Sequence, residues 1–150
     1  MKNKIFAASL ALAATTATAG DNGLMHKDSA MGVTETVDAM VTAMEGAGIT
    51  IFARVDHGAG AASIGEDIGD SQLLIFGNPK VGTPAIKDDP AAGLFLPLKV
   101  LVYEDGMGGT KIVYEEPAAM LGKLGGVSDE AAYLKTMAGA LAKFTDMAGN

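Results

Sequence analysis

Apolar residues recur at steps of three and four positions in two parts of the chain, which is typical of helices with one buried face. The first predicted helix starts at Val33 and ends at Gly46 or Gly48. The second lies near the end of the chain, with Ser128 as its N-cap and Asp129 and Glu130 in its first turn. The two apolar stripes are Val33, Val37, Met40, Val41 and Met44, and Ala131, Leu134, Met137, Ala138 and Leu141.

Five other stretches have the composition and patterning of strands. They are residues 24–29, 49–55, 73–76, 98–104 and 111–114. A glycine-rich loop joins the last two, which predicts a hairpin. The order is strand, helix, four strands and helix, with short helices predicted within 59–68 and at 117–121. This order favours an α+β fold with a mainly antiparallel five-stranded sheet and its helices on one face.

The strand patterns also predict which side chains share a face. In the second strand, alternation places Ile51, Ala53 and Val55 with Ile49 on one face, and Phe52 and Arg54 with Thr50 on the other. Residues 73–76 form a continuous apolar run, which predicts a strand buried on both faces, with Ile75 fully buried. After it, residues 77–84 break regular structure. Thr83 before Pro84 predicts an N-cap and the first residue of a short helix.

The first 19 residues have the pattern of a cleavable signal peptide. Lys2 and Lys4 precede an apolar run of residues 5–14, and residues 17–19 form a small-x-small cleavage site. We therefore expect export to the periplasm and a mature chain that begins near Gly20. The remainder divides into an N-terminal segment, residues 20–32, that holds the short first strand, and a single domain, residues 33–150.

Charge and composition exclude several classes of partner. Removal of Lys2 and Lys4 changes the formal net charge from −7 to −9, and Arg54 is the single arginine. This acidic balance argues against binding to nucleic acid or anionic membrane surfaces. The chain has no cysteine, which excludes disulfides and a lipid anchor on cysteine. No later stretch has the length of a membrane span, so we expect an acidic, soluble domain.

Three stretches together resemble a known family. They are residues 48–61, residues 72–84 with the segment Phe-Gly-Asn-Pro-Lys, and residues 96–105. They are similar to the bacterial family called domain of unknown function 302, and the likeness covers residues 33–122. The resemblance implies a β-α-β4-α fold like the curved-sheet halves of TATA-box-binding proteins, frequent pairing as homodimers and no DNA binding. The family's activity is not established.

His57 and the loop after residue 76 are the candidate site. His57 ends a strand, where an imidazole can transfer a proton or bond a loop carbonyl. Backbone N–H groups around Asn78, the ammonium of Lys80 and a helix start at Thr83 could bind a small anion, or the loop could simply be a turn. We predict that His57 and Asn78 lie within about 10 Å of each other. A helical crossover between their strands would make the strands parallel, so that both residues would lie at the same edge of the sheet.

Two other groups of residues, one of Met and His and one of paired acids, are weaker candidates for a site. Met25, His26 and Met31 are copper-type ligands, but in a strand the first two would face opposite sides, so we expect no metal site. The adjacent acid pairs at 88–89, 104–105 and 115–116 flank turns, where solvated charge is usual.

Three functions remain open. The first is an exported binding or accessory protein for a small polar or anionic ligand held by His57, Asn78, Lys80 and Thr83. The second is a small enzyme in which His57 is the general acid or base and Asn78 or Lys80 polarises the substrate. The third is a structural homodimer without a ligand site. The residues identify neither a cofactor nor a reaction.

Overall fold

The computed structural model describes residues 18–20 and 22–149, and it contains one antiparallel sheet. The strand order is β1-β2-β6-β5-β4-β3, so β3 is an edge strand. The strands are β1 (Thr18–Ala19), β2 (Leu24–Ser29), β3 (Thr50–Asp56), β4 (Ser71–Gly77), β5 (Leu98–Glu104) and β6 (Thr110–Glu115). The expected signal peptide lies outside the described residues except for Thr18 and Ala19, which form β1.

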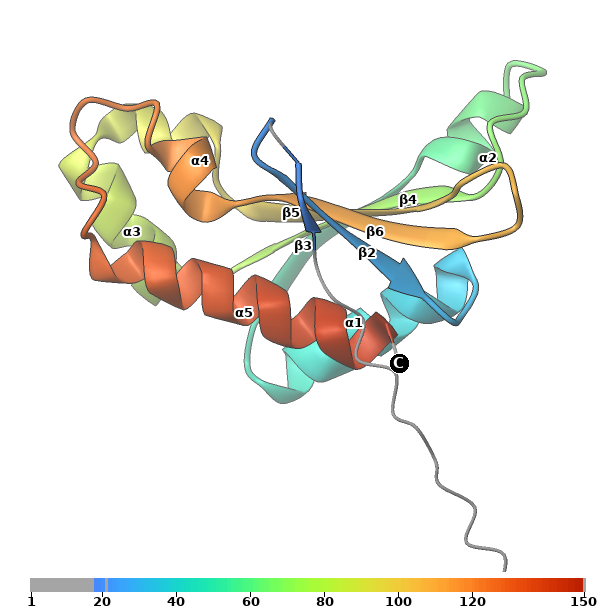
Figure 1. The fold of residues 1–150 in the computed structure, drawn as a ribbon, viewed down its shortest axis with the longest axis horizontal. Coiled ribbons are helices and arrows are strands. Elements are labelled where there is room, and N and C mark those ends of the chain that lie inside the picture. Colours follow the sequence, from blue (N-terminus) through green and yellow to red (C-terminus); the bar gives the residue numbers. More distant parts are fainter. Residues whose placement is uncertain (1–17, 21, 150) are drawn as a thin grey trace, which may run out of the picture.

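Two long helices cover one face of the sheet, and shorter helices lie at its ends (Figure 1). The helices are α1 (Val33–Gly46), α2 (His57–Ala62), α3 (Pro79–Asp88), the 3₁₀ helix η1 (Pro90–Leu94), α4 (Pro117–Leu121) and α5 (Ala132–Gly149). The predicted α+β class, with its antiparallel sheet and its β-α-β4-α order of main elements, is confirmed; the two-residue β1 adds a sixth strand to the five predicted. Within the described residues, none of the helices combines the length and hydropathy needed to cross a bilayer.

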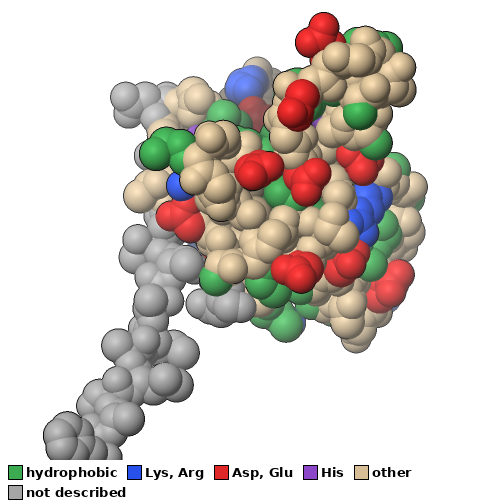
Figure 2. Space-filling model, turned by 90° about the vertical axis from the view of Figure 1, so that its right-hand side faces the viewer, with side chains coloured by type: hydrophobic (Ala, Val, Ile, Leu, Met, Phe, Trp, Pro, Cys, Tyr) green, Lys and Arg blue, Asp and Glu red, His purple; other side chains and the backbone are tan. Residues whose placement is uncertain are grey.

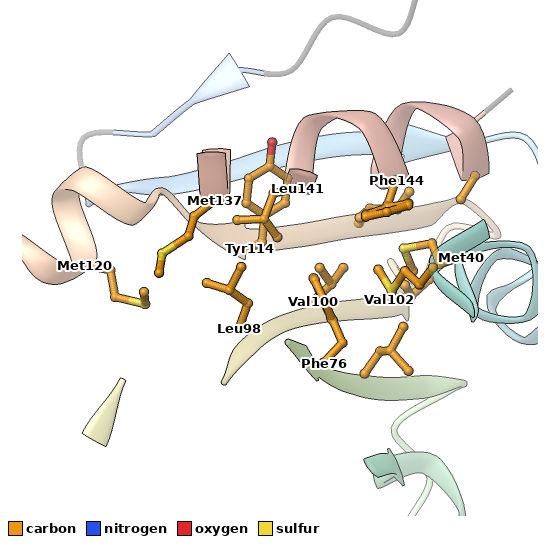
Figure 3. Packing of buried hydrophobic residues seen from close by; sticks show 14 of the residues in the cluster. Met40, Phe76, Leu98, Val100, Val102, Tyr114, Met120, Met137, Leu141 and Phe144 are labelled. Carbon is orange, nitrogen blue, oxygen red and sulfur yellow. The ribbon is translucent and has the colours of Figure 1, made fainter. Parts of the chain in front are cut away.

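The core lies between the sheet and the pair α1 and α5 (Figure 3). Side chains from β4, β5 and β6 meet the apolar stripes of the two helices, as the helical spacing predicted. Met40 from α1 and Met137 and Leu141 from α5 are at most 1% exposed. The strand side of this core consists of Leu74, Phe76, Leu98, Val100, Val102, Ile112 and Tyr114.

Two helix starts differ from the sequence prediction. Helix α3 begins at Pro79 rather than Pro84, because Asn78 is already in an extended conformation and its side chain accepts a hydrogen bond from the Lys80 N–H at 3.0 Å. Pro84 then lies inside the helix. Helix α5 begins at Ala132; the Ser128 hydroxyl does accept a bond from the Glu130 N–H, at 3.2 Å, but this bond closes a turn before the helix.

Strand β4 is covered on one face only, so the prediction that Ile75 is fully buried is wrong. Leu74 and Phe76 point into the core at 0% and 2% exposure, whereas Leu73 and Ile75 are half-buried on the other face. We call this other side the open face, since neither α1 nor α5 packs on it. Its middle row runs through register partners Val55, Leu73, Leu101, Val113 and His26.

A β-bulge at Phe52 corrects the predicted alternation of β3. Ile51 pairs with Phe76, but the next paired residue, Ala53, lies opposite Ile75, which leaves Phe52 as the extra residue. After one extra residue, each later side chain of the strand lies on the face opposite to the one that regular alternation predicts. Ile51 therefore packs on the core, while Ala53 lies on the open face with Val55, so these residues do not share one face as the pattern indicated.

Candidate functional site

The pairing of β3 with β4 separates the two halves of the predicted site. The strands are antiparallel, with Thr50 opposite Gly77 and Asp56 opposite Gln72. His57 follows one end of the pair and Asn78 follows the other. Six strand residues at about 3.3 Å each put them roughly 20 Å apart. The predicted pocket shared by His57 and Asn78 is therefore wrong, as is an enzyme in which Asn78 or Lys80 polarises a substrate held by His57.

His57 lies at the acidic end of the molecule. It is the exposed first residue of α2, and the preceding Asp56 caps that helix by accepting the Ala59 N–H at 2.8 Å. The register brings further carboxylates to this end, from Asp28, Asp70, Glu104 and Asp105. Figure 2 shows acidic side chains spread over this side of the molecule. Negative charge around an exposed imidazole disfavours an anionic ligand at His57.

A groove of about 250 Å³ opens at the other end of the sheet, where Asn78 lies. It runs between α3, the start of β3 and the segment before β5, with α5 beneath. Most of its wall is apolar, supplied by Phe52, Val81, Ile86, Leu96, Pro97 and Met137. Phe52 and Ile86 are 55% and 39% exposed, a large apolar surface in open contact with solvent.

Local backbone features shape this groove. The bulge in β3 leaves Phe52 without a strand partner at the groove wall. A Cβ at Gly77 would lie 3.4 Å from both the Phe52 ring and Pro97 Cβ, so glycine lets these two side chains close over the strand end. The peptide bond between Leu96 and Pro97 is cis. The groove thus depends on the bulge, on a glycine and on the turn that leads into β5.

Polar groups lie along one rim of the groove. Asn78 and Thr83 line it, and Thr83 is exposed. Lys80 is not among the lining residues; it lines a more open neighbouring hollow together with Lys87, and the two hollows share Pro79 and Thr83. Three of the four predicted site residues, Asn78, Lys80 and Thr83, therefore gather at this end, and His57 does not.

Asp88, an acidic residue of the neighbouring hollow, accepts a hydrogen bond from a tyrosine. The Tyr133 hydroxyl donates to Oδ2 of Asp88 at 3.0 Å. Burial, together with the hydrogen bond and negative charge of Asp88, raises the pKa of Tyr133 above its usual value. Asp89, the next residue, accepts from the N–H groups of Ala91 and Gly126. Both carboxylates are thus engaged in holding the α3 end together.

Met25 and His26, two of the copper-type ligands named above, do not come together on one face of the sheet. Met25 pairs with Tyr114 and His26 with Val113, so their side chains lie on opposite faces of β2, as strand geometry predicted. Residues 18–20 and 22–149 hold no group of three or more His, Cys, Asp or Glu residues placed to bind a metal ion.

Sequence reasoning missed the apolar wall of the groove. The sequence patterns place Phe52 on a strand face, Ile86 on the short helix after Thr83, and Leu96 and Pro97 in a connection, and none of them in a site. The available signal was the pair Asn78-Pro79, an N-cap followed by a helix-first proline, which begins a helix that carries Val81 and Ile86. It also missed a buried lysine, Lys27, which is 4% exposed between β2 and α5.

Comparison with known proteins finds relatives of similar sequence and a solved structure of similar fold. The chain is 39% identical over 98 residues to a protein of Brucella suis biovar 1 (strain 1330) named fluoride-specific ion channel FluC 1. The match covers 65% of this chain and 39% of that protein. A FluC 1 protein of Brucella abortus biovar 1 (strain 9-941) also matches at 39% identity, with 36% of its length covered. The chain thus spans less than two fifths of these relatives.

A solved structure has the same fold. It is an uncharacterized conserved protein DUF302 from Bacillus stearothermophilus, with a TM-score of 0.72 and 21% sequence identity. The likeness covers 84% of this chain and 98% of the solved one. The model of the family described as "Domain of unknown function DUF302" matches residues 25–146. The chain therefore belongs to the DUF302 family, as the stretches around Phe76 and Asn78 indicated.

Proposed function

We propose that this protein binds a small, largely apolar molecule in the groove between α3 and the starts of β3 and β5. The observation that carries the proposal is the exposure of Phe52 and Ile86 on the wall of a concave site. Ligand sites are typically concave and mostly apolar, with a few polar groups that orient the ligand. Asn78 and Thr83 are such groups here.

The apolar wall of the groove disfavours the small polar anion that the sequence suggested as a ligand. A small polar anion would lose hydration against Phe52, Ile86 and Leu96 without gaining hydrogen bonds in return. The same argument disfavours fluoride, so we do not carry the named activity of the Brucella relatives over to this groove. A ligand with an apolar body gains about 25 cal/mol for each Å² that it buries.

A glycine on α3 offers a direct test. Gly82 lines the groove, and a Cβ there would lie 3.6 Å from Leu96 Cδ1, an ordinary contact distance. Gly82→Leu should therefore fill the groove without disturbing the backbone. We expect the neutral apolar fluorophore N-phenyl-1-naphthylamine to bind the parent protein with enhanced emission, and Gly82→Leu to abolish that enhancement.

The control is the same substitution at Gly139, an exposed glycine of α5 where an added Cβ would meet no heavy atom of another part of the chain within 4 Å. Gly139→Leu should bind the fluorophore as the parent does. Thermal unfolding of both variants checks that each is folded. Failure of the parent to bind any apolar probe, or equal binding by the Gly82→Leu variant, would refute the groove as the site.

We further propose that the protein acts outside the cytoplasm as an accessory binding domain. The support is the signal-peptide pattern of residues 1–19 and the occurrence of a similar segment within longer proteins named as channels. Export predicts a periplasmic form whose intact mass corresponds to a chain that begins near Gly20. A periplasmic form that retains residues 1–19 would contradict this.

A homodimer through the open face is a second proposal, compatible with the first. The favouring observation is the apolar row from Val55 through Leu73, Leu101 and Val113, half-buried or exposed on a face that α1 and α5 leave uncovered. An apolar run on both faces is the pattern of a strand covered on both sides, and a second copy would supply the missing layer.

Sedimentation equilibrium tests the dimer. Leu101→Glu puts a charge in the middle of the row and should convert the dimer into a monomer. Met107→Glu adds the same charge on the exposed β5–β6 loop, where Met107 is 92% exposed, and should leave the mass unchanged. A parent protein that is monomeric at all concentrations would refute the dimer and leave the groove proposal standing.

A further inference from the structure

We propose that the ligand of the groove is a free monocarboxylate with an unbranched alkyl chain. Its chain lies in the groove against Ile86 and Phe52, and its carboxylate lies over Lys80 and Lys87 on α3. The inference rests on the proposed apolar groove and adds the ligand's charge, its orientation and its chemical class.

The apolar half of such a ligand matches the groove in kind and in size. The wall is formed by aliphatic and aromatic side chains, and the groove's volume of about 250 Å³ lies just below the usual range for ligand sites, about 300–1,000 Å³, so the groove suits a small ligand. A slender, flexible chain fits a narrow groove whose floor is Met137, a buried thioether that can adjust its shape. Affinity should therefore rise with chain length until the groove is full.

The anionic half is positioned by the spacing of residues on α3. Lys80, Thr83, Pro84 and Lys87 are separated by three, four and seven positions, so they lie along one side of the helix. They line the second hollow, and Thr83 belongs to both hollows. A ligand that enters the groove past Thr83 therefore has its exposed end beside two ammonium groups.

The charges around this strip favour an anion. In the described part of the chain, neither Lys80 nor Lys87 takes part in the ion pairs that occupy other lysines. Asp88 also lines the hollow, and its carboxylate, which accepts the Tyr133 hydroxyl, offsets one of the two positive charges and leaves one in excess. The acidic cluster around His57 lies at the far end of the sheet. A carboxylate is thus attracted to α3 and repelled from the opposite end.

A free carboxylate fits better than the head group of a membrane lipid. The chain as a whole carries a formal charge of −7, which opposes approach to an anionic bilayer. The groove is closed at its floor by the buried Met137, so it suits a single short chain.

Isothermal titration of the full chain with octanoate and with octan-1-ol tests the proposal. We expect octanoate to bind at least tenfold more tightly than the alcohol. Across butanoate, hexanoate and octanoate, the affinity should rise about fourfold for each added methylene. The double variant Lys80→Gln/Lys87→Gln should lose the preference for octanoate and keep its affinity for octan-1-ol.

The control variant is Lys135→Gln/Lys143→Gln, which removes the same charge from exposed positions of α5 and should keep the preference. Equal binding of octanoate and octan-1-ol by the parent would overturn the inference and leave the apolar groove intact. An unchanged preference in the Lys80→Gln/Lys87→Gln variant would overturn it in the same way. Absence of binding by both compounds would overturn the proposed function as well.

Discussion

The ammonium group of Lys27 donates a hydrogen bond to Oγ1 of Thr145, 2.7 Å away, beneath α5. The same nitrogen lies 2.5 Å from Oδ1 of Asp146 and 5.9 Å from the ring centre of Tyr114. The Lys27 side chain is 2% exposed, while that of Asp146 is 53% exposed. Burial of Tyr114 raises the pKa of its phenol, which therefore stays neutral beside the lysine. The cluster fixes the end of α5 onto β2.

Removal of the Lys27 side chain should be costly. Lys27→Ala leaves a cavity and the buried Thr145 hydroxyl without its donor, so we expect a loss of about 2–3 kcal/mol in the free energy of unfolding. Lys111→Ala is the matched control, because Lys111 forms an exposed ion pair with Asp28 and should cost about 1 kcal/mol or less. Urea unfolding measures both, and equal midpoints would contradict a structural role for Lys27.

Neighbouring residues of β4 test which face is covered. Leu74→Ala removes a fully buried side chain and should cost about 2–5 kcal/mol. Ile75→Ala on the open face should cost less in the monomer. If two copies pack through that face, the cost of Ile75→Ala should rise with protein concentration, because the monomer–dimer equilibrium then contributes to stability. A cost for Ile75→Ala that equals that of Leu74→Ala at every concentration would contradict the assignment of faces.

The main elements could be predicted because their burial pattern repeats along each element. Val37, Met40 and Leu141 identify the two long helices through spacing alone. Burial on each face of β4 could not be predicted, because an apolar run is the same whether a helix or another copy covers the second face. The bulge at Phe52 could not be predicted either, because one extra residue in a strand does not change the composition of the sequence.

The start of α3 can be tested through its two candidate caps. Asn78→Ala removes the side-chain acceptor of the Lys80 N–H and should cost about 1 kcal/mol. Thr83→Ala removes a hydroxyl inside the helix and should change stability by no more than about 0.5 kcal/mol. Thermal or urea unfolding distinguishes them. A larger effect at Thr83 would mean that the helix begins at Pro84, as the sequence alone indicated.

The β5–β6 loop predicts a pH dependence that one residue controls. Oδ1 of Asp105 accepts the N–H groups of Met107 and Gly109, each at 2.9 Å. The backbone bond from Met107, then that from Gly109, and then Lys111 hold the pKa of Asp105 below its ordinary value of 3.8. A depressed pKa in the folded state stabilises the fold above the unfolded-state pKa, and this contribution disappears as the pH falls through the folded-state pKa.

Comparison with Asp105→Asn isolates that effect, because asparagine keeps an oxygen acceptor but has no charge. We expect the difference in urea midpoint between the parent and this variant to be largest near pH 7 and to shrink as the pH falls below 3.8. Asp129→Asn, at an exposed position, controls for the change in net charge. A difference that is constant between about pH 7 and about pH 2.5 would show that the carboxylate charge is unimportant for the loop.

The candidate site was predicted only in part, and strand direction is the reason. The loop at Asn78 and Lys80 was found because its glycine, asparagine and proline have known backbone roles. Its separation from His57 was not, because a connection of a dozen residues permits both a crossover and an antiparallel return. The connection that contains α2 joins β3 to an antiparallel β4, so His57 and Asn78 lie at opposite ends of this strand pair.

The bulge in β3 has a consequence for how copies of this chain can meet. Strand β3 is an edge strand, and a regular edge offers free N–H and C=O groups on which another strand can extend the sheet. The irregularity at Phe52 interrupts that row of groups and twists the edge away from a regular partner. Addition of further strands along this edge, which is how fibrils grow, is therefore hindered. Copies of the chain can instead assemble by packing one sheet face on another.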